Sequence, residues 1–207
     1  CGGYRAQEQS LCRGFWSLKE VLSLKCSPRA GGVSDALADF FRAGAGDFAC
    51  REIALREKTI VPCQNCGACA PCPHCCPLDA LDDCREIFDA LEDAPLALFA
   101  APIYFYALPA HFKAFIDRGQ RFWQARQTRI RKAPVLALMA GGRPRGEKLF
   151  EGAIRTMRWF LKGMDADLDD SLCFRGLDNI GDLRARPEIA AEVAAWAQKW
   201  LAAAKNC

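Results

Sequence analysis

Apolar positions along the chain follow two spacings, one typical of buried strands and one typical of amphipathic helices. Two continuous apolar runs, Leu96 to Ala101 and Pro134 to Ala140, have the pattern of strands that are covered on both faces. Shorter apolar segments at Val21 to Leu24, Ala49 to Leu55 and Leu168 to Phe174 predict three more strands. The pattern therefore predicts five strands.

Between these segments, apolar residues recur three and four positions apart, which predicts helices. The five expected helical faces are Val33, Leu37, Phe40 and Phe41; Leu81, Cys84, Phe88 and Leu91; Phe112, Phe115, Ile116, Phe122 and Trp123; Leu149 to Leu161; and Ile189, Val193, Trp196, Trp200 and Leu201. Strands that alternate with helices predict a three-layer α/β sandwich around a parallel sheet. Ligands of such sheets bind at the carboxyl ends of the strands, which points to the loops at 27–34, 102–106 and 141–146. The cysteine-rich segment is expected on the same edge.

Length and charge narrow the class of protein. A chain of 207 residues suits one domain, expected at 20–207, after an N-terminal extension at 1–19 that has no sustained period. The net charge of +3 is too small to imply a nucleic-acid partner. No apolar run reaches the roughly 18 residues that span a bilayer, and no secretory leader is recognisable. We therefore expect a cytoplasmic protein with neither a membrane nor a nucleic-acid partner.

Cysteine is the residue type that stands out. Six of the 13 cysteines fall between Cys63 and Cys76. An odd, clumped set fits a reducing compartment and a metal better than a disulfide scaffold, and disulfides two residues apart are strained. A Cys-x-x-Cys-x-x-Cys loop can supply three thiolates to an iron–sulfur cluster from one segment.

The run of cysteines from Cys63 to Cys76 can supply four ligands in two alternative registers. One uses Cys63, Cys66, Cys69 and Cys75; the other uses Cys66, Cys69, Cys72 and Cys76 and matches the bacterial ferredoxin spacing, including the proline that follows. In two-cluster ferredoxins the fourth cysteine of that spacing serves the other cluster, which needs a second cysteine run that this chain lacks. The first register is therefore favoured, although Cys72 and Cys76 leave the fourth ligand open. The alternative is a tetrahedral zinc site on four of the six thiolates.

The loop from Ser27 to Ser34 joins a predicted strand to a helix start, where free N–H groups and the helix dipole favour a phosphate. Its two glycines allow close approach of the backbone, its serines add hydroxyl donors, and Arg29 can pair bidentately with a dianion. The alternative is a plain turn with Ser34 as the helix cap. No G-x-G-x-x-G follows the first strand, which counts against a Rossmann dinucleotide site.

Four segments together resemble the NAD(P)H-dependent FMN reductases, and more closely their iron–sulfur flavoprotein branch. The segments are the loop at 27–34, the run from Pro62 to Asp79, Pro102 to Tyr106, and Leu108 to Arg118. The resemblance extends from about Val21 to Leu201. It implies a flavodoxin-like fold with strand order 2-1-3-4-5 and a compact cysteine loop at 62–79 after the second strand.

The resemblance also implies the cofactors and the residues that hold them. The FMN phosphate would be held by Ser27, Arg29, Gly32, Val33 and Ser34. The isoalloxazine ring would be lined by two loops, Pro102, Ile103, Tyr104 and Phe105 in the first and Ala140, Gly141 and Gly142 in the second. A [4Fe–4S] cluster would be bound by Cys63, Cys66, Cys69 and Cys75. Val33 stands where the family often has asparagine, so only its backbone N–H can contact the phosphate.

The function that follows is an electron-transfer oxidoreductase. FMN would exchange two electrons with one partner and one electron with the cluster. The expected partners are NAD(P)H or a ferredoxin-like carrier and a small-molecule acceptor. The resemblance implies a homodimer or homotetramer in which cluster and flavin approach across a subunit boundary. No motif demands a protein acid, base or nucleophile, so no catalytic residue is expected.

Two other functions remain open at this point. One is an NAD(P)H-dependent FMN or quinone reductase whose cysteine loop binds zinc; the other is a non-enzymatic metal-binding protein on a flavodoxin scaffold. A basic stretch made of Arg118, Arg121, Arg126, Arg129, Arg131 and Lys132 is interpreted as the solvated face of a helix and its following loop, with a docking surface for an acidic electron carrier as the alternative.

Overall fold

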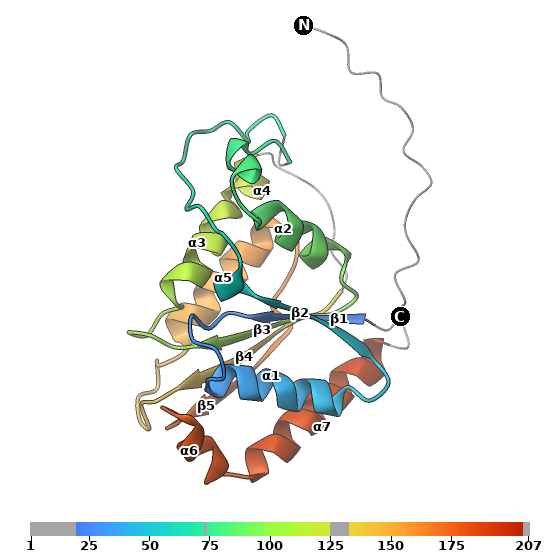
Figure 1. Cartoon of the computed structure of the whole chain (residues 1–207), viewed down its shortest axis with the longest axis vertical. Helices are drawn as coiled ribbons and strands as arrows, with labels where there is room; N and C mark the ends of the chain where they lie inside the picture. The colour runs from blue at the N-terminus through green and yellow to red at the C-terminus, as the bar shows by residue number, and fades with distance from the viewer. Residues whose placement is uncertain (1–19, 73, 125–132, 205–207) are drawn as a thin grey trace, which may run out of the picture.

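A computed structural model describes residues 20–72, 74–124 and 133–204. Its centre is a parallel five-stranded sheet with the order β2-β1-β3-β4-β5 (Figure 1). The strands are β1 (Glu20–Lys25), β2 (Ala49–Ala54), β3 (Ala97–Pro102), β4 (Val135–Gly141) and β5 (Asp170–Arg175). This confirms the predicted flavodoxin-like fold and its strand order. The expected extension at 1–19 lies outside the described residues.

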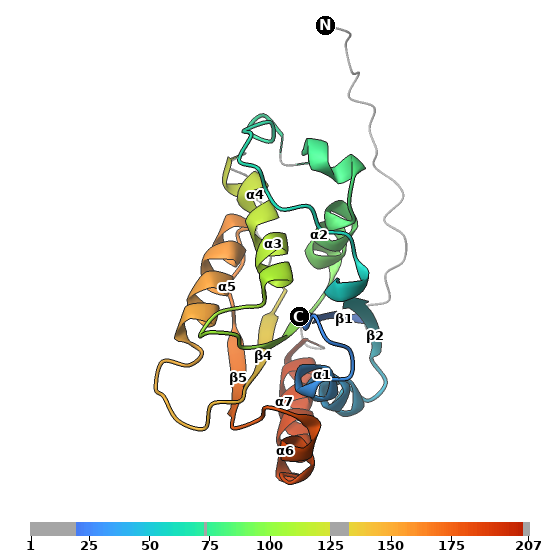
Figure 2. The ribbon, with the colours of Figure 1, turned by 60° about the vertical axis from the view of Figure 1, so that its left-hand side comes forward.

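Helices cover both faces of the sheet (Figures 1 and 2). One face carries α1 (Val33–Gly44), α6 (Ile180–Arg184) and α7 (Glu188–Ala204), and the other carries α2 (Cys84–Asp93), α3 (Ala110–Arg118), α4 (Gln120–Gln124) and α5 (Glu151–Gly163). Two short 3₁₀ turns, η1 (Leu55–Glu57) and η2 (Pro77–Ala80), frame the cysteine loop. None of the described helices combines the length and apolarity needed to cross a membrane.

Element boundaries differ from the sequence pattern in three places. The third expected helix is divided at Gly119 into α3 and α4. Leu81, expected on the apolar face of the second helix, lies before α2 and is 65% exposed. The shift has a local cause: Asp82 and Asp83, which directly precede α2, accept backbone N–H groups from Val61 and Thr59. These two carboxylates hold the start of the cysteine loop instead of extending the helix. The short helix α6 was not anticipated.

The core beneath α2, α3 and α5 is aromatic and fixes α3 on the sheet. The rings of Phe88 and Phe115 stack with their centroids 4.5 Å apart, and Phe115 also contacts Phe160 edge-on. Phe99 of β3 stacks on Phe112 of α3. Because α3 is held at several points, residues at both of its ends have fixed positions.

Replacing Phe115 by alanine removes a fully buried ring from this core. We expect Phe115→Ala to lower the free energy of unfolding by about 3–5 kcal/mol, measured by denaturant titration. The matched control is Leu81→Ala, an exposed position where the change should stay within about 0.5 kcal/mol. Equal effects of the two substitutions would contradict the packing of α3 described above.

Candidate functional site

The loop after β1 forms a cradle for an anion. Ser27 is buried, and its hydroxyl donates to the carbonyl of Arg29 at 2.9 Å and accepts the backbone N–H of Arg29 at 3.1 Å. Gly31, with φ +64°, then turns the chain into α1, a conformation that costs glycine little. Gly32 is the N-cap residue of α1, and among the described residues no side chain makes a capping hydrogen bond to the start of this helix. The first N–H groups of the helix are therefore available to a phosphate.

The other expected phosphate residues lie on this cradle in different ways. Arg29 is exposed, with its guanidinium beside Gly32. Val33 is buried in the core between the sheet and α7, so only its backbone can serve an anion. Ser34 is buried one position further along α1. The loop as a whole supports the expectation of a bound phosphate through its backbone and Arg29.

An ion pair beneath the cradle was missed by sequence reasoning. Asp35 in the first turn of α1 accepts the N–H of Gly31 at 2.9 Å. Its buried carboxylate pairs with Arg56 of η1 at 3.1 Å. Because Arg56 compensates this negative charge, Arg29 stays free for a ligand. An acidic residue in the first helical turn was the available signal.

The aromatic segment after β3 forms a tight, strained turn. Tyr104 and Ala107 exchange backbone hydrogen bonds of 3.0 and 2.9 Å. Phe105 and Tyr106 between them both have positive φ, 49° and 62°, which costs a bulky residue energy. The Phe105 side chain is 101% exposed. A strained turn that holds an apolar ring in solvent is suited to lining a flat aromatic ligand.

The loop after β4 closes this edge. Ile103 donates its N–H to the carbonyl of Ala140 at 2.8 Å, which joins the loops after β3 and β4. Gly142 packs so closely on the loop after β5 that a Cβ would lie 2.6 Å from a carboxylate oxygen of Asp178. Since β1, β3 and β4 are neighbours in the sheet, the three loops that the sequence singled out lie along one edge. The residues present therefore fit a flavin mononucleotide, with phosphate and ring at adjoining loops.

The cysteine loop has a different location from the one expected. It leaves β2 at η1 on the edge of the flavin loops, where His111 of α3 hydrogen-bonds the carbonyl of Leu55 at 2.6 Å. It then runs along α3 and reaches the level of α4 (Figures 1 and 2). The expectation that the cysteines share the flavin edge was wrong: nine residues of α3, about 13 Å of helix, separate them from it.

Four thiols share one small cavity in this loop. Its lining includes Cys63, Cys66, Cys69, Cys76, Arg118 and Arg121. Burial, and after it the thiols of Cys76 and Cys63, raise the pKa of Cys69. Cys75 is not part of the lining; a hydrogen bond with the thiol of Cys72 raises the pKa of Cys75. Three of the four expected metal ligands thus lie together, and their fourth neighbour is Cys76.

A metal centre is not assembled in the described ranges. Across residues 20–72, 74–124 and 133–204, no three His, Cys, Asp or Glu side chains converge closely enough to hold a metal ion. The case for a metal rests on chemistry: soft thiols in sufficient number, from one segment, around one cavity. On those grounds the residues fit a thiolate-bound cluster or zinc.

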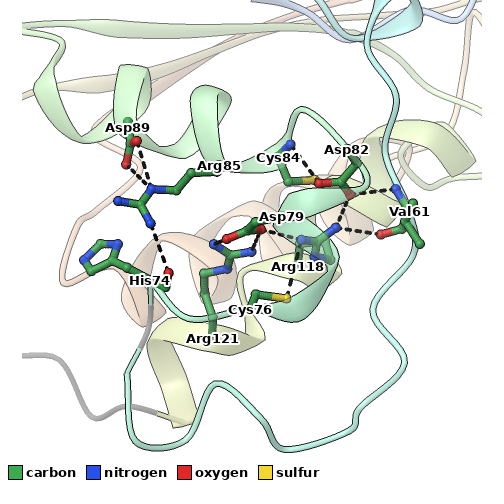
Figure 3. Close-up of polar contacts among 10 residues, drawn as sticks. All are labelled: Val61, His74, Cys76, Asp79, Asp82, Cys84, Arg85, Asp89, Arg118 and Arg121. Carbon is green, nitrogen blue, oxygen red and sulfur yellow. Dashed lines mark hydrogen bonds and ion pairs between the residues drawn. The ribbon is translucent and has the colours of Figure 1, made fainter. Parts of the chain in front are cut away.

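Two buried arginines also line this cavity, and Figure 3 shows the guanidinium of one of them, Arg118, beside Cys76. Arg118 donates to Asp82, to Asp79 at 2.6 Å, to the carbonyl of Val61 at 3.0 Å and to the sulfur of Cys76 at 3.5 Å. Arg121 pairs with Asp79 through both of its terminal nitrogens. These contacts attach the cysteine loop to the end of α3 and to α4.

The interpretation of this basic stretch as a solvated helix face was wrong for its first two members. Arg118 and Arg121 are 2% and 1% exposed. The signal was present in the sequence, because Arg118 stands three residues after Phe115, on the apolar stripe itself. The rest of the stretch, from Arg126 to Lys132, lies outside the described residues.

Comparisons with known proteins agree with this geometry. A family model described as NADPH-dependent FMN reductase matches residues 20–167. No protein of curated function matches the chain. An azoreductase of Bacillus anthracis has a similar structure, with a TM-score of 0.65 and 15% identity over 87% of this chain and 99% of that one.

Two further structures have a similar fold. An FMN-dependent NADH-azoreductase of Bacillus anthracis in complex with FMN has a TM-score of 0.62 and 11% identity, over 87% of this chain and 98% of that one. An NAD(P)H:quinone oxidoreductase of Methanothermobacter marburgensis has a TM-score of 0.62 and 16% identity, over 87% and 96%. At these identities the likeness shows the fold.

The cysteines of the core should be chemically distinct from those of the loop. Burial raises the pKa of Cys84 to about 12 and that of Cys26 well above its ordinary value. At pH 8, roughly one Cys84 in ten thousand is then a thiolate, the reactive form. In folded, metal-free, reduced protein we expect iodoacetamide to label Cys66 but leave Cys84 and Cys26 intact, measured by mass spectrometry of peptides. Labelling of Cys84 as fast as Cys66 would contradict this assignment.

Proposed function

Because this chain belongs to the NADPH-dependent FMN reductase family, and is therefore an FMN-dependent oxidoreductase, we propose that it transfers electrons between FMN and a [4Fe–4S] cluster. The observation that supports the cluster is the gathering of Cys63, Cys66, Cys69 and Cys76 around one cavity above two buried guanidinium groups. Zinc held by the same thiolates is the competing occupant.

Different residues would contact the phosphate and the ring of FMN. We assign the phosphate to Arg29 and to the backbone N–H groups at the start of α1, and the ring to the strained turn at Tyr104 and Phe105 and the loop at Ala140 to Gly142. When bound, FMN supplies the exchange between two-electron and one-electron chemistry, and a cluster supplies one-electron storage. The exposed side chain of Phe105 would shield the ring from water.

Both electron-transfer partners are part of the proposal, and the comparisons support each of them. The family name supports NADPH as donor. Structural neighbours are named azoreductase and quinone oxidoreductase, which supports an azo compound or a quinone as the class of acceptor. We also propose the homodimer or homotetramer that the sequence resemblance implies, in which the cluster of one subunit would approach the flavin of another.

The test is the cofactor content of protein purified without oxygen. We expect about four irons, four sulfides and one FMN per chain, with the broad brown absorbance of a cluster beneath the flavin bands. Flavin with zinc and no sulfide would replace the proposal by a reductase with a structural metal. Flavin with neither metal nor sulfide would contradict it.

Arg29 offers a test of the flavin site alone. Arg29→Ala removes the one exposed cation of the cradle, so we expect FMN to bind roughly 10- to 100-fold more weakly, measured by fluorescence titration of apoprotein. Riboflavin, which lacks the phosphate, should bind the variant and the parent equally. Arg155→Ala, an exposed arginine of α5 paired with Glu151, is the matched control. An equal loss for riboflavin would show that Arg29 does not act on the phosphate.

A further inference from the structure

Cys75 and Cys76 are alternative candidates for the fourth ligand of the proposed metal centre, and they have different surroundings in the structure. Cys76 lines the cavity with Cys63, Cys66 and Cys69. Cys75 is exposed and is not among the residues that line this cavity; its backbone N–H donates to the carbonyl of Cys72 at 3.1 Å. The two neighbouring sulfurs therefore belong to different surroundings.

Cys76 is also the one loop cysteine, among the described residues, whose sulfur accepts a hydrogen bond from an arginine side chain (Figure 3). The donor, Arg118, is at the last position of α3. Its guanidinium is fixed by Asp79, Asp82 and the carbonyl of Val61. These contacts set the orientation of the guanidinium and direct one of its N–H groups at the sulfur of Cys76.

The donors of this network exceed its acceptors. Within the part of the chain that the structure describes, the Nε atoms of Arg118 and Arg121 are buried and have no hydrogen-bond partner. The formal charges of the two arginines and of Asp79 and Asp82 cancel. Buried polar groups are rarely left without a partner. The two arginines that carry these donors also line the cavity of the four cysteines, where their charge suits a negatively charged ligand.

We propose that Cys76 is the fourth thiolate ligand of the metal centre, and that Arg118 is the positioning residue that holds its sulfur and raises the reduction potential of the cluster. This inference rests on the proposed function. Hydrogen bonds to ligating sulfurs stabilise the more negative, reduced form of a cluster. Since Asp79 follows Cys76 by three residues and pairs with both arginines, the same network orients the ligand and supplies the donor.

The ligand assignment is tested by a matched pair of variants. In anaerobically purified protein, Cys76→Ser should lose most of its iron and sulfide, whereas Cys75→Ser should keep both at the level of the parent. FMN content reports that each variant is folded. Loss of the cluster in Cys75→Ser with retention in Cys76→Ser, or retention in both, would overturn the assignment. Neither residue is in the core, so both variants should fold.

The role of Arg118 is tested by a variant that keeps its charge. Arg118→Lys retains a cation but loses the planar fork that reaches Asp79, Asp82 and Cys76 together. We expect the cluster to form, its midpoint potential to shift to more negative values, and iron to pass to a chelator roughly 10- to 100-fold more readily. The control is Arg85→Lys: Arg85 binds the carbonyl of His74 and Asp89 but no described cysteine sulfur.

These experiments distinguish a failure of the proposed function from a failure of the role given to Arg118. A parent protein that contains FMN but no acid-labile sulfide would refute the proposed function, and this inference with it. A parent with a cluster whose potential and iron retention are the same in Arg118→Lys as in Arg85→Lys would overturn the role of Arg118 alone. If Arg118→Lys fails to fold, the cysteine pair still decides the ligand.

Discussion

The attachment of the cysteine loop depends on charged groups buried beneath it. The loop between η1 and η2 has few apolar side chains, so it cannot hold itself in place by a core of its own. Arg118 and Arg121 instead hold it through Asp79 and Asp82, whose side chains are 15% and 0% exposed. Removing one partner of a buried pair costs about 3–5 kcal/mol, because the other charge is left without compensation. The loop is thereby made part of the α3–α4 corner.

The flavin loops at the opposite end of α3 are held in place by different interactions from those of the cysteine loop. There the flavin loops are placed by the order of the parallel strands, and the local detail is backbone strain at Phe105 and Tyr106. Strain of this kind persists where the surroundings enforce it, and here the turn closes directly before a helix anchored in an aromatic core. One site is thus built from topology and strain, and the other from buried charge.

The sequence was sufficient for the elements whose pattern is local. The apolar runs of β3 and β4 and the stripes of α1 and α5 predicted the sheet, its layers and the loops at its edge. It was insufficient where a side chain's role depends on distant partners. Arg118 was read as solvated because its partners, Asp79 and Asp82, are about 36 to 39 positions away. The choice between Cys75 and Cys76 depends on which sulfur faces Arg118, which no spacing rule contains. The ion pair of Asp35 and Arg56 was missed for the same reason.

The helix between the two sites makes them separable in evolution. A single residue inserted into α3 would rotate everything after it by about 100° and carry Arg118 away from Cys76. The flavin loops after β1 and β3 precede the helix, and the loop after β4 is placed by the sheet, so all three would keep their positions. A lineage could therefore abandon the metal in one step while retaining the flavin, whereas the reverse loss would require changes in several loops at once. The fold thereby confines the proposed cluster to a single corner of a flavin-binding domain.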